Sequence, residues 1–203
     1  MNLSERIEVL RNVVWEVVAY KDFIEYLSYD LHPTPSRIDN NAGVHFIWRS
    51  MIRLQIITLN KLIKDNGAFS FHKIINMAGA KVKGFHIDEF QEELDVMINE
   101  FKANNLDTVR DKFLAHLDIS AEEIKTDIHI LSIKANQVVS LFNNIAAKLG
   151  FPEYTHDERC INGLNEIFSE LDEYELVKAF LMASEIKNKE LVSISEIAEA
   201  IKG

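Results

Sequence analysis

The stretch from Ser120 to Gly150 reads SAEEIKTDIHILSIKANQVVSLFNNIAAKLG, and it carries the clearest signal of secondary structure in the chain. Apolar residues recur in it at intervals of three and four, which is the spacing of one face of an α-helix. Ser120 and Glu123 have the spacing of an N-terminal capping box, and Phe151-Pro152 follows Gly150 as a stop signal. The stretch therefore predicts a long amphipathic helix that ends at Gly150.

The same helical spacing extends in both directions along the chain, and only seven glycines and three prolines interrupt it. We expect an all-α fold: an up-and-down helical bundle over residues 1–150, with an acidic C-terminal helical extension over residues 151–203 packed on the same body. The expected helices cover about residues 3–31, 43–65, a short turn at 70–78, a helix opening near Asp88, 108–118, 120–150, 158–187 and 194–202.

Two of these expectations rest on particular residues. Asp88 and Gln91 have capping-box spacing, which places a helix start at Asp88, and Asn104-Asn105 interrupts that helix before the next one begins. In the 43–65 helix, a helical wheel gathers seven apolar residues on one side. They are Ile47, Met51, Ile52, Leu54, Leu59, Leu62 and Ile63.

Length and composition are those of a folding globular chain, with 203 residues, 47% apolar and 27% charged. The net charge of -10 is unevenly spread, because residues 151–203 hold 12 acidic and five basic side chains. Residues 37–83, in contrast, carry eight Lys or Arg against Asp39 and Asp65. A basic face that binds nucleic acid is compatible with the acidic total.

Several absences bound the location and the chemistry. Cys160 is the single cysteine and has no partner for an internal disulfide. The first residues lack the order of a secretory signal, and no apolar run is long enough to cross a membrane. We therefore expect a cytoplasmic, soluble protein without a membrane partner. The histidines show no metal-ligand spacing, so we expect no metal and no cofactor.

The best chemical signal lies in the segment Val109-Arg110-Asp111-Lys112-Phe113-Leu114-Ala115-His116-Leu117-Asp118. On a helix, Arg110 falls among the apolar residues of this segment, where a guanidinium needs an anionic or hydrogen-bonding partner from protein or phosphate. His116 follows six positions later, about 9 Å along the axis and about 120° around it. The two side chains would border one groove that a neighbouring helix or subunit completes.

This Arg-x5-His pattern resembles the motif of the HEPN superfamily, and the form RDKFLAHLD looks most like its abortive-infection, phage-exclusion branch. The upstream stretch Leu62-Ile63-Lys64-Asp65, followed by the Ser70–Ile75 segment, is similar to that branch as well. The architectural resemblance covers roughly residues 1–149, whereas the specific motif covers about nine residues. Residues 151–203 carry no motif of the family.

The resemblance implies a toxin-type, phage-defence protein that forms a homodimer and cleaves RNA without a metal in a shared cleft. Arg110 would hold the scissile phosphate, and His116, which titrates near neutral pH, would take or give a proton. Asp111 is a third candidate catalytic residue, and Lys112 a candidate substrate-binding residue. An antitoxin or a nucleotidyltransferase-type protein is a possible partner.

A second basic feature lies on the 43–65 helix, where Arg49, Arg53, Asn60 and Lys64 fall within about 60° of one another on the wheel. Arg49, Arg53 and Lys64 are candidate RNA-binding residues, and the neighbouring Trp48 is a candidate base-stacking residue. A solvated helix face explains the same arginines and lysine without a ligand.

Two other functions remain open from the sequence. In the first, the protein is a non-catalytic HEPN-like interaction or nucleotide-binding module, in which Arg110 pairs with a carboxylate and His116 is a structural core residue. In the second, the chain is the antitoxin-like, regulatory half of a two-component system.

Overall fold

The computed structural model describes residues 1–28, 42–64, 67, 69–115 and 128–156, together with 162–163 and 166. The chain divides into two compact units, Met1–Asp157 and Glu158–Gly203. All interactions presented below belong to the first unit. The helices predicted beyond residue 157 lie outside the described residues, apart from 162–163 and 166, which are helical.

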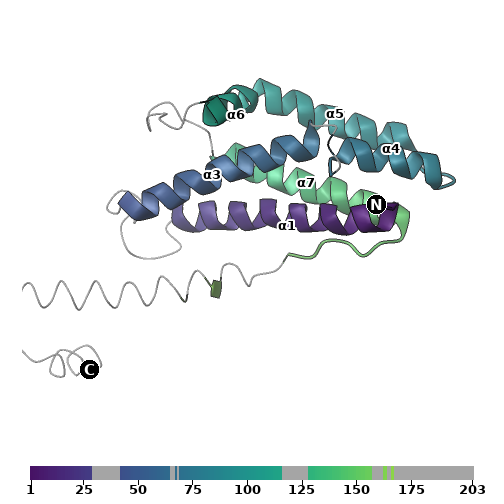
Figure 1. The fold of residues 1–203 in the computed structure, drawn as a ribbon, viewed down its shortest axis with the longest axis horizontal. Coiled ribbons are helices and arrows are strands. Elements are labelled where there is room, and N and C mark those ends of the chain that lie inside the picture. Colours follow the sequence, from purple (N-terminus) through teal and green to yellow (C-terminus); the bar gives the residue numbers. More distant parts are fainter. Residues whose placement is uncertain are drawn as a thin grey trace, which may run out of the picture. The chain divides into compact units, whose positions relative to one another are not determined.

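Six helices build the described part of the first unit, which contains no strand. They are α1 (Leu3–Ser28), α3 (Ala42–Ile63), α4 (Phe71–Lys81), α5 (Ile87–Ala103), α6 (Leu106–Ala115) and α7 (Ile128–Leu149). Helix α1 packs against α3 and α7, and α4 pairs with α5, which also contacts α6 and α7 (Figure 1). The predicted all-α bundle is confirmed. None of the described helices has a stretch long and apolar enough to span a bilayer.

Local sequence signals fix several helix ends. At the start of α1, the Asn2 side chain accepts a hydrogen bond from the Glu5 backbone N–H at 2.9 Å, and the Glu5 carboxylate accepts one from the Asn2 N–H. This reciprocal pair is a capping box. At the end of α7, Gly150 has a φ of 70°, and the Phe151 N–H donates to the Ala146 carbonyl at 2.9 Å. That Schellman arrangement confirms the predicted stop.

The predicted helix start near Asp88 is confirmed to within one residue, but the capping box predicted for Asp88 and Gln91 is wrong. Helix α5 begins at Ile87 with His86 as its N-cap, so Asp88 lies inside the first turn rather than before it. An apolar contact explains why the helix begins before Asp88. The ring of Phe85 stacks on that of Phe90 with centroids 4.8 Å apart, which is a hydrophobic staple across the helix start. Asp88 and Glu89 then occupy the first turn, where a negative charge favours the helix dipole.

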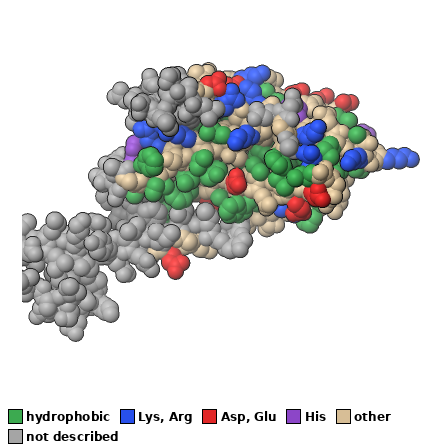
Figure 2. Space-filling view, viewed as in Figure 1, with side chains coloured by type: hydrophobic (Ala, Val, Ile, Leu, Met, Phe, Trp, Pro, Cys, Tyr) green, Lys and Arg blue, Asp and Glu red, His purple; other side chains and the backbone are tan. Residues whose placement is uncertain are grey.

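The apolar face predicted for α3 was also partly wrong. Ile47 and Leu54 remain 43% and 41% exposed, whereas Ile56, which was left out of that face, is fully buried. Because apolar residues surround most of this helix, the wheel could not define which sector faces the core. Figure 2 shows hydrophobic side chains at the surface of the molecule along α1 and α3.

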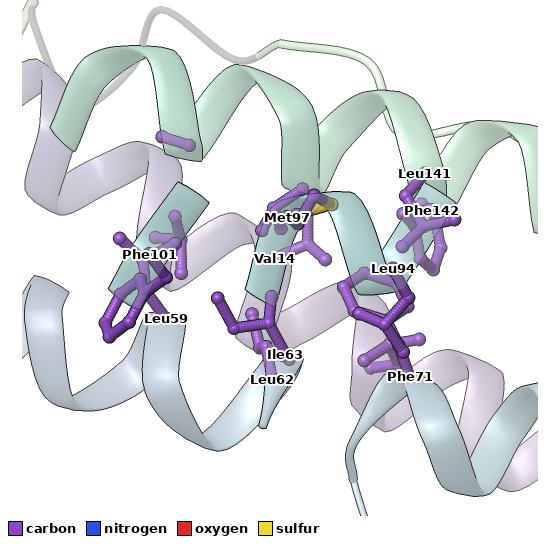
Figure 3. Packing of buried hydrophobic residues seen from close by; sticks show 14 of the residues in the cluster. Val14, Leu59, Leu62, Ile63, Phe71, Leu94, Met97, Phe101, Leu141 and Phe142 are labelled. Atoms are coloured by element: carbon purple, nitrogen blue, oxygen red, sulfur yellow. The ribbon is translucent and has the colours of Figure 1, made fainter. Parts of the chain in front are cut away.

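One core joins all six helices. Leu59, Leu62 and Ile63 of α3 meet Leu94 and Met97 of α5 in its centre (Figure 3). Val14 of α1, Phe71 of α4, Phe101 of α5, and Leu141 and Phe142 of α7 complete the labelled cluster. Burial of each such side chain stabilises the fold by about 1.5–3 kcal/mol relative to exposure. The bundle is therefore held mainly by this shared apolar core.

The seven described residues after α7, 150–156, pack back onto the bundle. Arg11 donates a hydrogen bond to the Pro152 carbonyl at 2.7 Å, and the Asn143 side chain of α7 exchanges hydrogen bonds with the Tyr154 backbone. His156 then lies 3.6 Å from the carboxylate of Asp22, which is buried in α1. Burial has the largest effect on the pKa of Asp22 and raises it above the ordinary value. The positive charges of His156 and Lys21 partly offset this rise.

An ion pair between a buried lysine and a half-exposed glutamate connects α5 with α7. Lys134 is buried, and its ammonium donates to the Glu100 carboxylate and, at 2.8 Å, to Gln137. Gln137 in turn donates to the same Glu100 oxygen at 3.0 Å. The hydrogen bond from Lys134, followed by the one from Gln137, lowers the pKa of Glu100 below its ordinary value of 4.5.

Glu100→Ala is expected to lower the free energy of unfolding by about 1–3 kcal/mol, because it leaves the buried ammonium of Lys134 with a single neutral partner. Since the pKa of Glu100 is lower in the folded protein than in the unfolded chain, its stabilisation is present above the ordinary value of 4.5 and is lost as the pH falls through the folded value. Urea unfolding at pH 7 and at steps below 4.5 measures this loss. Glu92→Ala, an exposed glutamate on the same helix, is the matched control.

Candidate functional site

The segment that carries the predicted motif lies against the C-terminal half of α3. Helix α5 ends at Ala103 with Asn104 as its C-cap, and Asn105 adopts a φ of 57°, which turns the chain into α6. Leu106 is buried in the core and anchors the start of α6. Asp107 and Arg110 are three residues apart on α6, and Asn60 and Lys64 are four apart on α3, so each pair shares a helix face.

These four residues and Asp111 form a continuous polar network, the Asn60 cluster. The Lys64 ammonium donates to Asp107 at 2.5 Å, and the Asn60 amide N–H donates to the other Asp107 oxygen at 3.3 Å. The Asn60 amide oxygen accepts a hydrogen bond from Arg110 Nη1 at 2.5 Å. Arg110 Nε and Nη2 donate to one Asp111 oxygen at 2.8 and 2.5 Å.

Burial differs sharply within the Asn60 cluster. Asn60 is 2% exposed, and its amide uses both its donor and its acceptor side to fix Asp107 and Arg110. The side chain of Arg110 is 25% exposed, and that of Asp111 is 64% exposed. A guanidinium has five N–H groups, and three of them have the partners given above. Arg110 is thus held by a buried residue on one side and by a solvated carboxylate on the other.

The arrangement can bind an anion. Lys64 and Asp107 neutralise each other within the cluster, so Asp111 is the anion that an incoming phosphate would compete with at Arg110. An exposed ion pair contributes little to stability, typically about 0–1 kcal/mol. Exchanging Asp111 for a phosphate oxygen at the same guanidinium edge therefore has a small cost, and Arg110 is suited to bidentate phosphate binding.

The other predicted site residues fall in different places. Arg49 and Arg53 are partly buried on earlier turns of α3 and each takes part in an interaction. Trp48 donates a hydrogen bond to the Ser28 hydroxyl at 2.8 Å and stacks on His45, so its ring is part of the α1–α3 contact. His116 lies outside the described residues, as does the side chain of Lys112. The groove predicted between Arg110 and His116 stays a prediction.

Two residues of the Asn60 cluster were misread or missed in the sequence. Asn60 was placed on a surface stripe with Arg49 and Arg53, but it is buried against α6. Asp107 was not singled out. A usable signal was present: Asp107 and Arg110 on one helix face the complementary pair Asn60 and Lys64 on another, each at helical spacing. Only the packing of α3 on α6 identifies them as one group.

Among the described residues, no group of three or more His, Cys, Asp or Glu side chains is placed to hold a metal ion. No family model, curated protein or solved structure matches the chain. The chemistry of this site is therefore argued from the residues of the Asn60 cluster themselves.

Asn60→Ala is expected to lower the free energy of unfolding by about 1–3 kcal/mol, because it removes a buried partner from both Asp107 and Arg110. Chemical denaturation at neutral pH measures the change. Asn12→Ala, at an exposed position of α1, is the control and is expected to change stability by less than about 0.5 kcal/mol. Equal effects of the two substitutions would show that Asn60 does not hold the cluster together.

Proposed function

We propose that this chain is a HEPN-like protein of the abortive-infection, toxin type, and that it binds and cleaves RNA at a site centred on Arg110 and His116. The proposal rests on how the guanidinium of Arg110 is held and exposed. Its guanidinium is fixed by the buried Asn60 while a quarter of the side chain remains exposed, which suits it to hold a phosphate.

The proposed reaction needs no cofactor. The ribose 2′-oxygen attacks the adjacent phosphorus, a new O–P bond forms, and the bond from phosphorus to the 5′-oxygen of the next nucleotide breaks. His116 takes the proton of the 2′-hydroxyl, and His116 of a second copy in a homodimer gives a proton to the leaving oxygen. Arg110 stabilises the charge that develops on the phosphate. The products are a 2′,3′-cyclic phosphate and a 5′-hydroxyl end.

Asp111 has a regulatory place in this proposal rather than a chemical one. Its carboxylate occupies the Nε and Nη2 edge of Arg110, which is the edge a phosphate would use. Asp111 keeps the guanidinium oriented in the free protein and leaves when RNA binds. Lys64 is neutralised by Asp107 at the other end of the Asn60 cluster, so Arg110 is the cation of the cluster that a phosphate would reach once Asp111 leaves.

One observation favours the non-catalytic alternative. The charges within the Asn60 cluster are balanced, since Lys64 pairs with Asp107 and Arg110 pairs with Asp111. In this alternative, the cluster joins α3 to α6, and the chain serves as an interaction or nucleotide-binding module. Two measurements separate the functions: the non-catalytic module predicts no RNA cleavage by the wild type, together with a clear loss of folding free energy in Arg110→Ala.

The first test is cleavage of mixed tRNA and mRNA in EDTA by the wild type, Arg110→Ala and His116→Ala, with folding verified by circular dichroism and thermal unfolding. Loss of a general acid–base group typically costs about 10²–10⁴-fold in rate, so both variants are expected to lose at least that much cleavage. Product ends are analysed for the cyclic phosphate and the 5′-hydroxyl.

Lys102→Ala, an exposed lysine on α5, controls for the loss of one positive charge and is expected to cleave like the wild type. Asp111→Asn is expected to bind RNA more tightly, because it removes the anion that competes with phosphate at Arg110. Absence of any cleavage by folded wild-type protein contradicts the ribonuclease and leaves the binding module. Cleavage that survives in folded His116→Ala contradicts the assigned proton transfer.

The homodimer and the antitoxin or nucleotidyltransferase-type partner belong to the same proposal. A second copy is required because a single His116 cannot act as base and acid in the same step. Sedimentation of the wild type over a range of concentrations tests for the dimer, and mixing of inactive Arg110→Ala and His116→Ala chains tests whether the two copies share one site.

A further inference from the structure

A pocket separate from the Asn60 cluster lies between α1, α3 and the turn that leads into α4. Its volume is about 320 Å³. Its walls include Val13 and Glu16 of α1, Lys61 and Leu62 of α3, and Phe69 before α4. No residue of the pocket belongs to the Asn60 cluster, so a ligand site here and the proposed ribonuclease activity can be tested independently.

The pocket combines two opposite charges that do not neutralise each other. Glu16 and Lys61 line it from two helices packed side by side, and both side chains are exposed. Neither forms an ion pair with any residue that the structure describes. The Glu16 carboxylate does act on its surroundings: together with burial, which is the larger cause, it raises the pKa of Tyr20 one turn along α1.

Much of the remaining lining is apolar, although Thr58 and Ser70 also contribute to it. Leu62 is buried in the wall, Val13 is partly buried, and Phe69 is 41% exposed beside the opening. An exposed phenylalanine next to a pocket offers a ring that can cover an apolar group. The pocket therefore combines an ammonium from α3, a carboxylate from α1 and several apolar side chains.

Size and charge together restrict the ligand. Pockets for drug-sized ligands typically have volumes of about 300–1,000 Å³, so this one lies at the small end of the range and suits a small molecule. A ligand with one charge would pair with only one of Glu16 and Lys61. An α-amino acid carries an ammonium and a carboxylate on one carbon, so it can pair with both while its side chain lies against the apolar part of the lining.

We propose that the pocket lined by Val13, Glu16, Lys61, Leu62 and Phe69 binds a free α-amino acid with a large apolar side chain. Glu16 accepts hydrogen bonds from the ligand's ammonium, and Lys61 donates to its carboxylate. The apolar side chain packs on Val13 and Leu62, with Phe69 over it. The chain thus carries a small-molecule site that shares no residue with the Asn60 cluster.

The test titrates the full-length protein with L-phenylalanine over the millimolar range, using calorimetry or ligand-observed NMR. Three analogues are run in parallel: N-acetyl-L-phenylalanine lacks the ammonium, L-phenylalaninamide lacks the carboxylate, and N-acetyl-L-phenylalaninamide lacks both. Saturable binding of L-phenylalanine is expected. Each singly blocked analogue is expected to bind at least about tenfold more weakly, because a charge-assisted hydrogen bond is lost.

Two variants test which side chain binds each charged group of the ligand. Glu16→Gln is expected to remove the preference for L-phenylalanine over its N-acetyl form, and Lys61→Gln the preference over its amide. Lys81→Gln and Glu92→Gln, exposed positions on α4 and α5, are matched controls that retain both preferences. No saturable binding of L-phenylalanine, or unchanged preferences in both pocket variants, overturns the proposal. Equal binding of the doubly blocked analogue also overturns it and identifies the pocket as a site for a peptide side chain.

Discussion

Helix α3 packs against each of the other five described helices, and this central position constrains the rest of the structure. A helix surrounded in this way must bury side chains over most of its circumference, including polar ones. Gln55, Thr58 and Asn60 are all buried on it. Both amide atoms of Gln55 lack a hydrogen-bond partner in the described part of the chain, whereas Asn60 has one on each side.

The Asn60 cluster follows from that constraint. A buried amide is stable only if its donor and its acceptor are both used, and Asn60 achieves this by binding Asp107 and Arg110 of α6 at the same time. Packing of α6 on α3 is therefore specified by polar geometry as well as by the buried Leu106. The same contact that satisfies Asn60 leaves Arg110 oriented at the surface. A structural requirement and a candidate phosphate site are thus met by one set of hydrogen bonds.

The extent to which charged side chains are paired differs among three polar regions of the first unit. Lys134 and Glu100 form a pair in which the cation is buried, so its loss would be costly. In the Asn60 cluster the pairs lie at the edge of the bundle, and the exposed Asp111 can be exchanged for another anion. In the pocket between α1 and α3 the charges of Glu16 and Lys61 remain unpaired among the described residues. The degree of pairing therefore separates residues that hold the fold from residues available to a ligand.

The sequence by itself determined the helical class, the approximate extent of α1, α3 and α5, and the end of α7 at Gly150, because apolar spacing and capping residues act over one or two turns. It also singled out Arg110 as a cation that needs a partner. The tertiary structure decided which partner, since Asn60 lies 50 residues away in the chain. It likewise decided that Ile56 is buried while Leu54 is exposed. On a helix that is apolar on most sides, only the neighbouring helices determine which face is the core.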